Sequence, residues 1–213
     1  MKIAIISANF NKFDSHKEWE VPMEIDVFRV NEDIIPVRKY AMTGRLQSKL
    51  LKEFGWQIYP GYDIYMWIDA SFKLLPGATE WLLSGLGDKD LALFKHPFNN
   101  TIKEEYEFLK SNMNKEYVRK RYETEFLEEQ YKVITDDKSY IDDSLYCGGI
   151  IIYKNDVKVF NMLKEWWYHT TRYHMDDQLS LPYVLRKSGC SFNVFKENIY
   201  KLPLIPHISH NIK

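Results

Sequence analysis

The sequence predicts an α/β fold, in which helices flank a mostly parallel central sheet. Two observations predict it. Apolar segments of strand length alternate along the chain with segments of helical periodicity, and several apolar segments are almost uninterrupted, as in strands buried on both faces. The chain has 213 residues, which is enough for one large domain with a real core. We therefore expect residues 1–213 to form a single domain.

Six segments have the composition of strands. The first, 2–9, is rich in β-branched residues, and Asn9 and Asn11 favour a loop after it. Residues 90–97 form an apolar run that is closed by Pro97, which cannot extend a central strand. The expected strands are 2–9, 25–30, 63–70, 90–97, 144–155 and 191–195.

Four further segments have apolar residues at helical spacing. They are 41–55, 77–87, 156–173 and 176–189. Gly55 is a plausible end for the first helix, and Pro76 and Gly87 frame the second. In the last segment Asp176 is a candidate cap, whereas Pro182 must kink the helix or shift its start.

The segment 101–140 differs from the rest of the chain. Its first part, 101–132, is rich in Glu, Lys and Tyr, with opposite charges three or four residues apart. Such spacing favours solvated helices, because side chains three or four apart are neighbours on a helix surface. We expect a helical insertion here, with a lid or an acceptor-binding role as the alternative to a plain solvated face.

Composition excludes several classes of function. The net charge of −1 removes the electrostatic argument for a nucleic-acid binder. No run of eighteen apolar residues exists, so no membrane span is expected. Cys147 and Cys190 lie in apolar contexts and are interpreted as reduced, buried thiols. The first residues lack a signal-peptide cleavage site, so a cytoplasmic location is expected; the sequence sets no oligomeric state.

One apolar strand ends in an acid. In "YMWIDASFKL" (65–74), Asp69 follows a buried-looking run and Ser71 comes two positions later. Ligands of parallel α/β sheets bind at the carboxyl ends of the strands, which is where Asp69 falls. Three interpretations compete: a cap of the next turn, a partner for a distant Lys or Arg, and a metal ligand with Ser71 on the same side.

The order of elements resembles that of glycosyltransferases of the GT-A fold. Asp69-Ala70-Ser71 stands where that fold carries its Asp-x-Asp motif, and "YCGGIIIYKN" (146–155) resembles the strand that lines the donor sugar. "DDQLSLPYVL" (176–185) resembles the Asp-Gln element of the glycogenin-like retaining families. The tail "HISHNIK" (207–213) resembles the His-x-x-Gly-x-x-Lys end of those families.

A plant family of Golgi glycosyltransferases is more similar still. It shares the patterns "WIDAS", "ALFKHP", "CGGIII" and "DDQLSLPYVL". The length and the start of the chain also resemble the first domain of a chlorella-virus glycan-building glycosyltransferase, which would imply a viral protein in the host cytoplasm. The resemblance covers nearly the whole chain except 101–140.

The resemblance implies roles for individual residues. Asp69, Ser71 and His207 would hold the metal, and Asp177 and Gln178 would contact the donor sugar as the catalytic pair. The residues that would contact the nucleotide-sugar are Ser7, Ala8, Asn9, Arg45, Lys49, Asp69, Ala70, Ser71, Gly148, Gly149 and Lys213.

Two residues depart from the family pattern. Ser71 replaces the second acid of the motif, which puts the second metal ligand in doubt, and His210 stands where the families have Gly. The chemistry nevertheless suits the remaining groups. A leaving diphosphate needs its charge neutralised, and Mn²⁺ or Mg²⁺ prefers carboxylate and phosphate oxygens, with Mn²⁺ also accepting an imidazole.

The expected activity is therefore metal-dependent transfer of a hexosyl or deoxyhexosyl group from a nucleotide-diphospho-sugar, a UDP-sugar in the first instance, to a glycan acceptor. Retention of anomeric configuration rests on the glycogenin-like tail. One alternative is a sugar-1-phosphate nucleotidyltransferase, although "ISANFNKFDS" (6–15) lacks the glycine-rich loop of that class. The other is a non-catalytic nucleotide-sugar-binding module, which the loss of an acid at Ser71 favours.

Overall fold

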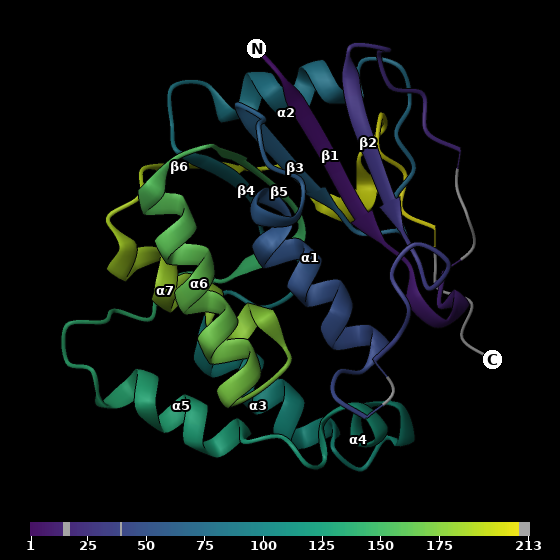
Figure 1. Cartoon of the computed structure of the whole chain (residues 1–213). Coiled ribbons are helices and arrows are strands. Elements are labelled where there is room, and N and C mark those ends of the chain that lie inside the picture. Colours follow the sequence, from purple (N-terminus) through teal and green to yellow (C-terminus); the bar gives the residue numbers. More distant parts are fainter. Residues whose placement is uncertain (15–17, 39, 209–213) are drawn as a thin grey trace.

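The computed structural model describes residues 1–14, 18–38 and 40–208. Within these residues the centre of the molecule is a six-stranded sheet of order β2-β1-β3-β5-β4-β6 (Figure 1). The strands are β1 (Ile3–Ala8), β2 (Ile25–Val30), β3 (Ile64–Ile68), β4 (Leu91–Lys95), β5 (Tyr146–Lys154) and β6 (Phe192–Phe195). The β1–β2, β1–β3 and β4–β6 pairs are parallel, whereas β5 runs antiparallel to β3 and β4. The sheet is mostly parallel, as the sequence predicts.

Helices cover both faces of the sheet and extend below it in Figure 1. The helices are α1 (Gly44–Ile58), α2 (Ala78–Leu86), α3 (Ile102–Asn112), α4 (Glu116–Tyr122), α5 (Leu127–Asp136), α6 (Val157–Arg172) and α7 (Leu181–Ser188), with short 3-10 helices η1 (Phe10–Lys12), η2 (Asp177–Leu179) and η3 (Ile199–Lys201). One apolar core joins the sheet to α1, α6 and α7, and a second joins its other face to α2.

Every residue of β1 and β3 is buried, which explains why these strands read as continuous apolar runs. Their parallel register pairs Ile6 with Trp67, so both strands end at the same edge of the sheet. β5 runs in the opposite direction, and its first residues therefore lie at this edge too. The backbone N–H of Asp69 donates to the carbonyl of Gly149 at 2.8 Å. The topology thus gathers chain segments around Asp69.

The segment 176–189 is not one helix. Asp176 caps the 3-10 helix η2 by accepting from the backbone N–H of Gln178 at 3.4 Å, and α7 begins only at Leu181. Pro182 lies in the first turn of α7, where a residue without a backbone N–H loses no intrahelical bond. The proline therefore shifts the start of the helix instead of kinking it.

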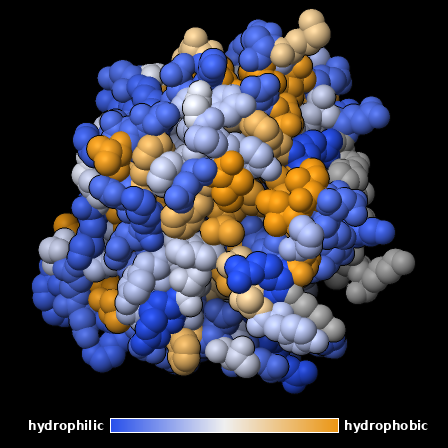
Figure 2. Space-filling view, in the orientation of Figure 1, coloured by the Kyte–Doolittle hydropathy of each residue, from blue (hydrophilic) through white to orange (hydrophobic). Residues whose placement is uncertain are grey.

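The surface in the orientation of Figure 1 is mostly hydrophilic, with hydrophobic side chains in small groups (Figure 2). Within the described residues, no helix is both long enough and apolar enough to span a bilayer. The segment 101–140 forms α3, α4 and α5, which lie along the lower edge of Figure 1. It is helical, as its charge spacing predicts, and α4 lies close to the beginning of α1.

Candidate active site

Two adjoining cavities open where β1 and β3 end. The larger has a volume of about 310 Å³ and the smaller of about 190 Å³. The two cavities share five lining residues, which we call the junction: Arg45, Lys49, Lys52, Asp69 and Arg121. The junction therefore carries four cationic side chains and one carboxylate between two differently lined spaces.

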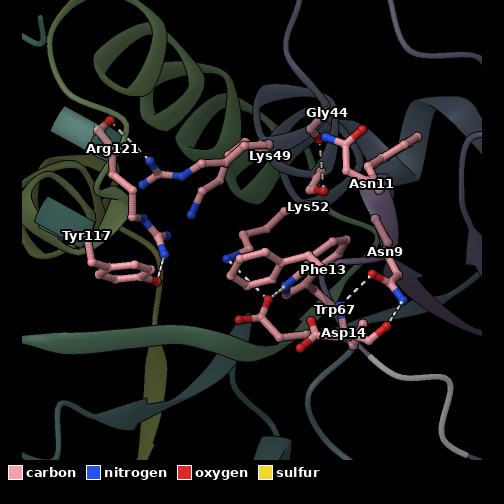
Figure 3. A pocket seen from close by; sticks show the side chains of 16 residues that line it. Asn9, Asn11, Phe13, Asp14, Gly44, Lys49, Lys52, Trp67, Tyr117 and Arg121 are labelled. Atoms are coloured by element: carbon pink, nitrogen blue, oxygen red, sulfur yellow. Dashed lines mark hydrogen bonds and ion pairs between the residues drawn. The ribbon is translucent and has the colours of Figure 1, made fainter. Parts of the chain in front are cut away.

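The larger cavity is lined by aromatic and small polar side chains. Figure 3 shows Asn9, Phe13 and Asp14 facing Lys49 and Arg121 across it. The side chain of Asn9 fixes the loop after β1, because its Nδ2 donates to the carbonyl of Asp14 at 2.7 Å and its Oδ1 accepts from the backbone N–H of Asp14 at 3.0 Å. The other residues that line this cavity beyond the junction are Ala8, Phe10, Asn11, Gly44, Ser48, Trp67, Ala70 and Tyr117.

The smaller cavity is more polar. It is lined beyond the junction by Ser71, Phe72, Tyr122, Cys147, Gly148, Gly149, Met175, Asp176, Asp177, Gln178, Tyr200 and His207. This set contains the expected sugar-side residues Gly148, Gly149, Asp177 and Gln178, which come from β5 and η2. The structure thus brings together segments that are about thirty residues apart in the sequence.

Asp69 is held at the junction with its side chain 41% exposed. Its Oδ1 accepts from the indole Nε1 of Trp67 at 2.6 Å and lies 3.6 Å from the Nζ of Lys52. Of the three interpretations of an acid at the end of a strand, pairing with a distant lysine is realised. The carboxylate also remains open to the cavities, so it is available to a ligand.

α1 presents its cations on one face. Arg45, Lys49 and Lys52 are spaced four and three residues apart, which places them on the same side of a helix. Both lysines are ion-paired with Asp177, and the Lys52 Nζ lies 2.7 Å from the Asp177 Oδ2. Burial alone would raise the pKa of Asp177, but the two lysines outweigh it and hold that pKa below its ordinary value. Asp177 is therefore ionised and fixes the position of both ammonium groups.

Gly148 and Gly149 leave room for these acids. A Cβ at Gly148 would come within 3.1 Å of the Asp177 Oδ2 and 3.3 Å of the Lys52 Nζ. A Cβ at Gly149 would come within 3.2 Å of the Phe72 Cε2 and 3.4 Å of the Asp69 Oδ2. A side chain at Gly148 would therefore press on the Asp177–Lys52 ion pair, and one at Gly149 would press first on the ring of Phe72.

The two arginines of the junction have no carboxylate partner among the described residues. Within the described part of the chain, neither Arg45 nor Arg121 has an acidic oxygen within 4.0 Å. Arg45 donates to the carbonyl of Arg121 at 3.3 Å, and Arg121 donates to the hydroxyl of Tyr117. Both guanidinium groups lie over the ring of Tyr122, at 4.6 and 5.6 Å. Two guanidinium groups that have no carboxylate partner among the described residues, and that lie beside a cavity, are suited to binding an anion.

The C-terminal segment returns to the motif after β3. The backbone N–H of Ile208 donates to the carbonyl of Ser71 at 2.8 Å, and Phe72 forms an isolated β-bridge with His207. Asp69, Ser71 and His207 therefore line the same cavity, whereas His210 and Lys213 lie outside the described residues.

This donor set fits a divalent cation only in part. A carboxylate, a hydroxyl and an imidazole are groups that Mn²⁺ accepts. However, no three His, Cys, Asp or Glu side chains of the described chain are grouped so that they could hold a metal ion. A cation at Asp69 would need further oxygens from its ligand, which the phosphates of a nucleotide could supply.

Two buried carboxyls lie behind the site. Burial, with Asp177 second, raises the pKa of Glu53 well above its ordinary value. Burial and then Asp176 raise the pKa of Glu105 to about 8, and the Glu105 Oε2 accepts from the Nδ2 of Asn99 at 2.6 Å. A pKa of about 8 keeps Glu105 mostly protonated near pH 7, and the raised pKa of Glu53 likewise favours its neutral form.

The structure places most of the expected contact residues at the cavities. Ala8, Asn9 and Ala70 line the larger one, whereas Ser7 is buried in β1 and is not among the described residues that line either space. Gln178 lines the smaller cavity, with its Nε2 3.3 Å from the Asp176 Oδ1.

Sequence reasoning missed several residues at the cavities: Lys52, Trp67, Tyr117, Arg121, Asp176 and Tyr200. Lys52 had a usable signal, because it continues the spacing of Arg45 and Lys49 along one helix face. Arg121 had none, because the basic residues near it in sequence look alike until α4 is packed.

No family model matches this chain, and no curated protein sequence matches it. The solved structures that are similar to this chain include two glycosyltransferases. One is a glycosyltransferase involved in the glycosylation of the major capsid of PBCV-1, with a TM-score of 0.52, 11% identity, and coverage of 97% of this chain and 93% of that one. The other is the bifunctional glycosyltransferase WbbM, with a TM-score of 0.50, 12% identity, and coverage of 91% and 38%. With its mostly parallel sheet and the reversed β5, this chain has the fold of the GT-A glycosyltransferases.

Proposed function

We propose that this chain is a metal-dependent glycosyltransferase that uses a nucleotide-diphospho-sugar, a UDP-sugar in the first instance, and transfers its hexosyl or deoxyhexosyl group to a glycan acceptor with retention of configuration. The single observation that supports it most is the two-part cavity with a cationic junction. A nucleotide-sugar has the same three parts in the same order: a nucleoside, a diphosphate and a sugar.

Each part of that donor has a matching part of the site. The aromatic larger cavity suits a nucleoside, because Phe13 and Trp67 offer rings to a base and Asn9 offers a polar edge. The junction suits a diphosphate. The polar smaller cavity suits a sugar, because Asp176, Asp177 and Gln178 can bind hydroxyl groups.

The reaction breaks the bond between the anomeric carbon and the diphosphate, so negative charge grows on the leaving oxygen. Lys49, Lys52, Arg45 and Arg121 lie where that charge would develop, and groups placed in advance there lower the barrier. Asp177 orients the two lysines without titrating at neutral pH. A divalent cation held by Asp69, Ser71 and His207 would add charge to both phosphates when it is bound. In the proposal, Lys213 adds a further positive charge to the leaving phosphate.

Retention of configuration and the choice of a UDP-sugar rest on the resemblance of "DDQLSLPYVL" and "HISHNIK" to the glycogenin-like families. Both of the similar solved structures described above are glycosyltransferases by their descriptions, which supports the reaction class.

The test is turnover of purified protein with UDP-glucose, UDP-galactose, UDP-N-acetylglucosamine and dTDP-rhamnose, each with and without Mn²⁺. Release of the nucleoside diphosphate is measured, because slow hydrolysis of the donor by water needs no known acceptor. We expect release from at least one donor, with Mn²⁺ raising the rate. Tight UDP binding without release from any donor would instead favour the non-catalytic binding module, which the neutral residue Ser71 in place of an acid also favours.

A further inference from the structure

An exposed aromatic side chain lies next to the smaller cavity and takes no part in the donor site described above. Phe98 follows β4 and is 74% exposed, a large fraction for a phenyl ring. Exposing that much apolar surface to water is unfavourable, and the ring buries little of itself in the core. Its ring contacts are with His96, at 6.0 Å and nearly edge-on, and with Tyr200, at 5.9 Å.

Tyr200 connects Phe98 to the site. Its ring is tilted by only 26° from that of Phe98, and it lies nearly parallel to Phe72, at 7° and 6.3 Å. Tyr200 and Phe72 both line the smaller cavity, and Tyr200 also meets the ring of His207 at 4.7 Å. Phe72, Tyr200 and Phe98 thus form a row of roughly parallel rings, which we call the aromatic row. It leads from the wall of the sugar-side cavity out to solvent.

From this row we infer that the chain binds the acceptor by stacking one of its pyranose rings on Phe98 and Tyr200. The inference rests on the proposed function, in that the smaller cavity is taken to hold the donor sugar. An acceptor hydroxyl must reach the anomeric carbon in that cavity, so the acceptor ring has to lie at its mouth, where the aromatic row emerges.

The chemistry of the row selects a neutral sugar with an apolar face. A pyranose carries a patch of C–H groups on one face. Burying that patch against an aromatic ring is favourable, because the hydroxyl groups at the edge of the sugar stay in water. The groups on the row suit this ligand. Phe98 carries no charge, and burial lowers the pKa of His96, which is therefore neutral at physiological pH. A protein partner would need a wider apolar surface than one exposed ring and one half-exposed ring.

The experiment measures sugar binding directly, apart from turnover. Saturation-transfer NMR is recorded with methyl β-D-glucopyranoside, methyl β-D-galactopyranoside and methyl α-D-mannopyranoside, with UDP and Mn²⁺ present and again without them. We expect at least one glycoside to receive saturation, strongest on the C–H groups of one ring face. Phe98→Ala should weaken its binding about three- to tenfold, the scale of one aromatic contact, whereas Phe98→Trp should preserve it.

Phe108→Ala is the matched control, because Phe108 is also exposed, at 48%, but lies on α3 and, among the described residues, makes no ring contact with the aromatic row. It should bind the glycosides like the unmodified protein. UDP affinity, measured by calorimetry, should be the same in all variants, which also shows that Phe98→Ala is folded.

The outcomes separate this inference from the proposed function. Two outcomes, each with normal UDP binding, would show that the stacking inference is wrong and that the donor site stands. In one, Phe98→Ala binds the glycosides as well as the unmodified protein does. In the other, no glycoside receives saturation. If UDP fails to bind but Phe98→Ala still loses the glycoside signal, the aromatic row binds a sugar and the donor assignment is wrong.

Discussion

The carboxylate of Asp69 lies between the two cavities, where Trp67 and Lys52 hold one of its oxygens. We expect Asp69→Asn to lower turnover at least about 100-fold, the scale of removing one charge-stabilising group from a preorganised site. The substitution keeps the shape of the side chain and removes its charge, so the melting temperature without ligand should change little. Ser71→Ala is the comparison and should reduce turnover only severalfold, because a neutral hydroxyl contributes little to cation binding. Equal losses in the two variants would mean that the serine is an indispensable ligand.

Glu105 allows a second test at the scale of a residue. Burial and Asp176 raise its pKa from the ordinary 4.5 to about 8, so the folded protein keeps a proton there that the unfolded chain has lost at neutral pH. The stabilising contribution is therefore complete below about pH 4.5 and is lost as the pH rises through 8. Between pH 4.5 and about 8, ionisation of Glu105 should therefore lower the free energy of unfolding by roughly 1.4 kcal/mol per pH unit.

Glu105→Gln should flatten that dependence, because the amide cannot ionise. Urea unfolding at pH 5.5, 6.5 and 7.5 measures the slope, and Glu104→Gln, on the exposed side of the same helix, is the control. A variant whose stability falls with pH as steeply as that of the unmodified protein would show that Glu105 does not carry the raised pKa.

A local pattern in the sequence marks only some of the site residues. Asp69 is marked because an acid follows an apolar strand, whereas Arg45 and Lys49 are expected from the resemblance to the GT-A glycosyltransferases. The ion pairs of Asp177 with lysines more than 120 positions away have no local trace, since α1 and η2 meet only when the sheet forms. The direction of β5 is hidden for a similar reason, because burial on both faces gives the same apolar run in either direction.

At the scale of elements, the helices of 101–140 do more than cover the sheet. α4 places Arg121 at the junction, and the contact between Arg45 and the Arg121 carbonyl ties α4 to α1. The charge spacing of this segment predicted helices correctly. It could not show that α4 borders the expected donor site, because Arg119, Lys120 and Arg121 are equivalent in an isolated helix and only packing distinguishes them.

Arg121→Ala should weaken UDP binding about 10- to 100-fold, because a hydrogen bond to a charged group contributes about 1.5–3 kcal/mol. Arg119→Ala is the matched control. Arg119 belongs to the same helix, but its side chain is 56% exposed and lies 3.7 Å from Glu123. Calorimetric titration with UDP measures both. If the two variants bind UDP equally well, α4 is a solvated helix and not a wall of the donor site.

At the scale of the whole molecule, charge is distributed unevenly. The net charge is −1, yet four cationic side chains meet at the junction beside the single carboxylate of Asp69. Asp177 offsets part of the charge of Lys49 and Lys52, so the positive charge that stays uncompensated is mainly that of the two arginines. Uncompensated charge of one sign in a cleft concentrates oppositely charged ligands. The net charge gives no reason to expect a nucleic-acid binder, but it also conceals this local group of cationic side chains.

This distribution predicts how the stability of the whole chain responds to ligands. UDP, UMP and uridine share the nucleoside that the larger cavity would hold, but only UDP carries two phosphates to the junction. UDP at a hundredfold its dissociation constant should add about 2.7 kcal/mol to the free energy of unfolding, which is a rise of roughly 5–10 °C in melting temperature for a chain of this size. At the same concentration UMP should give a smaller rise and uridine almost none. Mn²⁺ should increase the UDP shift more than the UMP shift, because a cation at Asp69 would complete its coordination with oxygens of both phosphates.

Melting curves with each nucleotide, with Mn²⁺ and with a chelator, measure these shifts. Equal shifts for UMP and UDP, unchanged by the chelator, would show that neither the cationic junction nor Asp69 contacts a diphosphate.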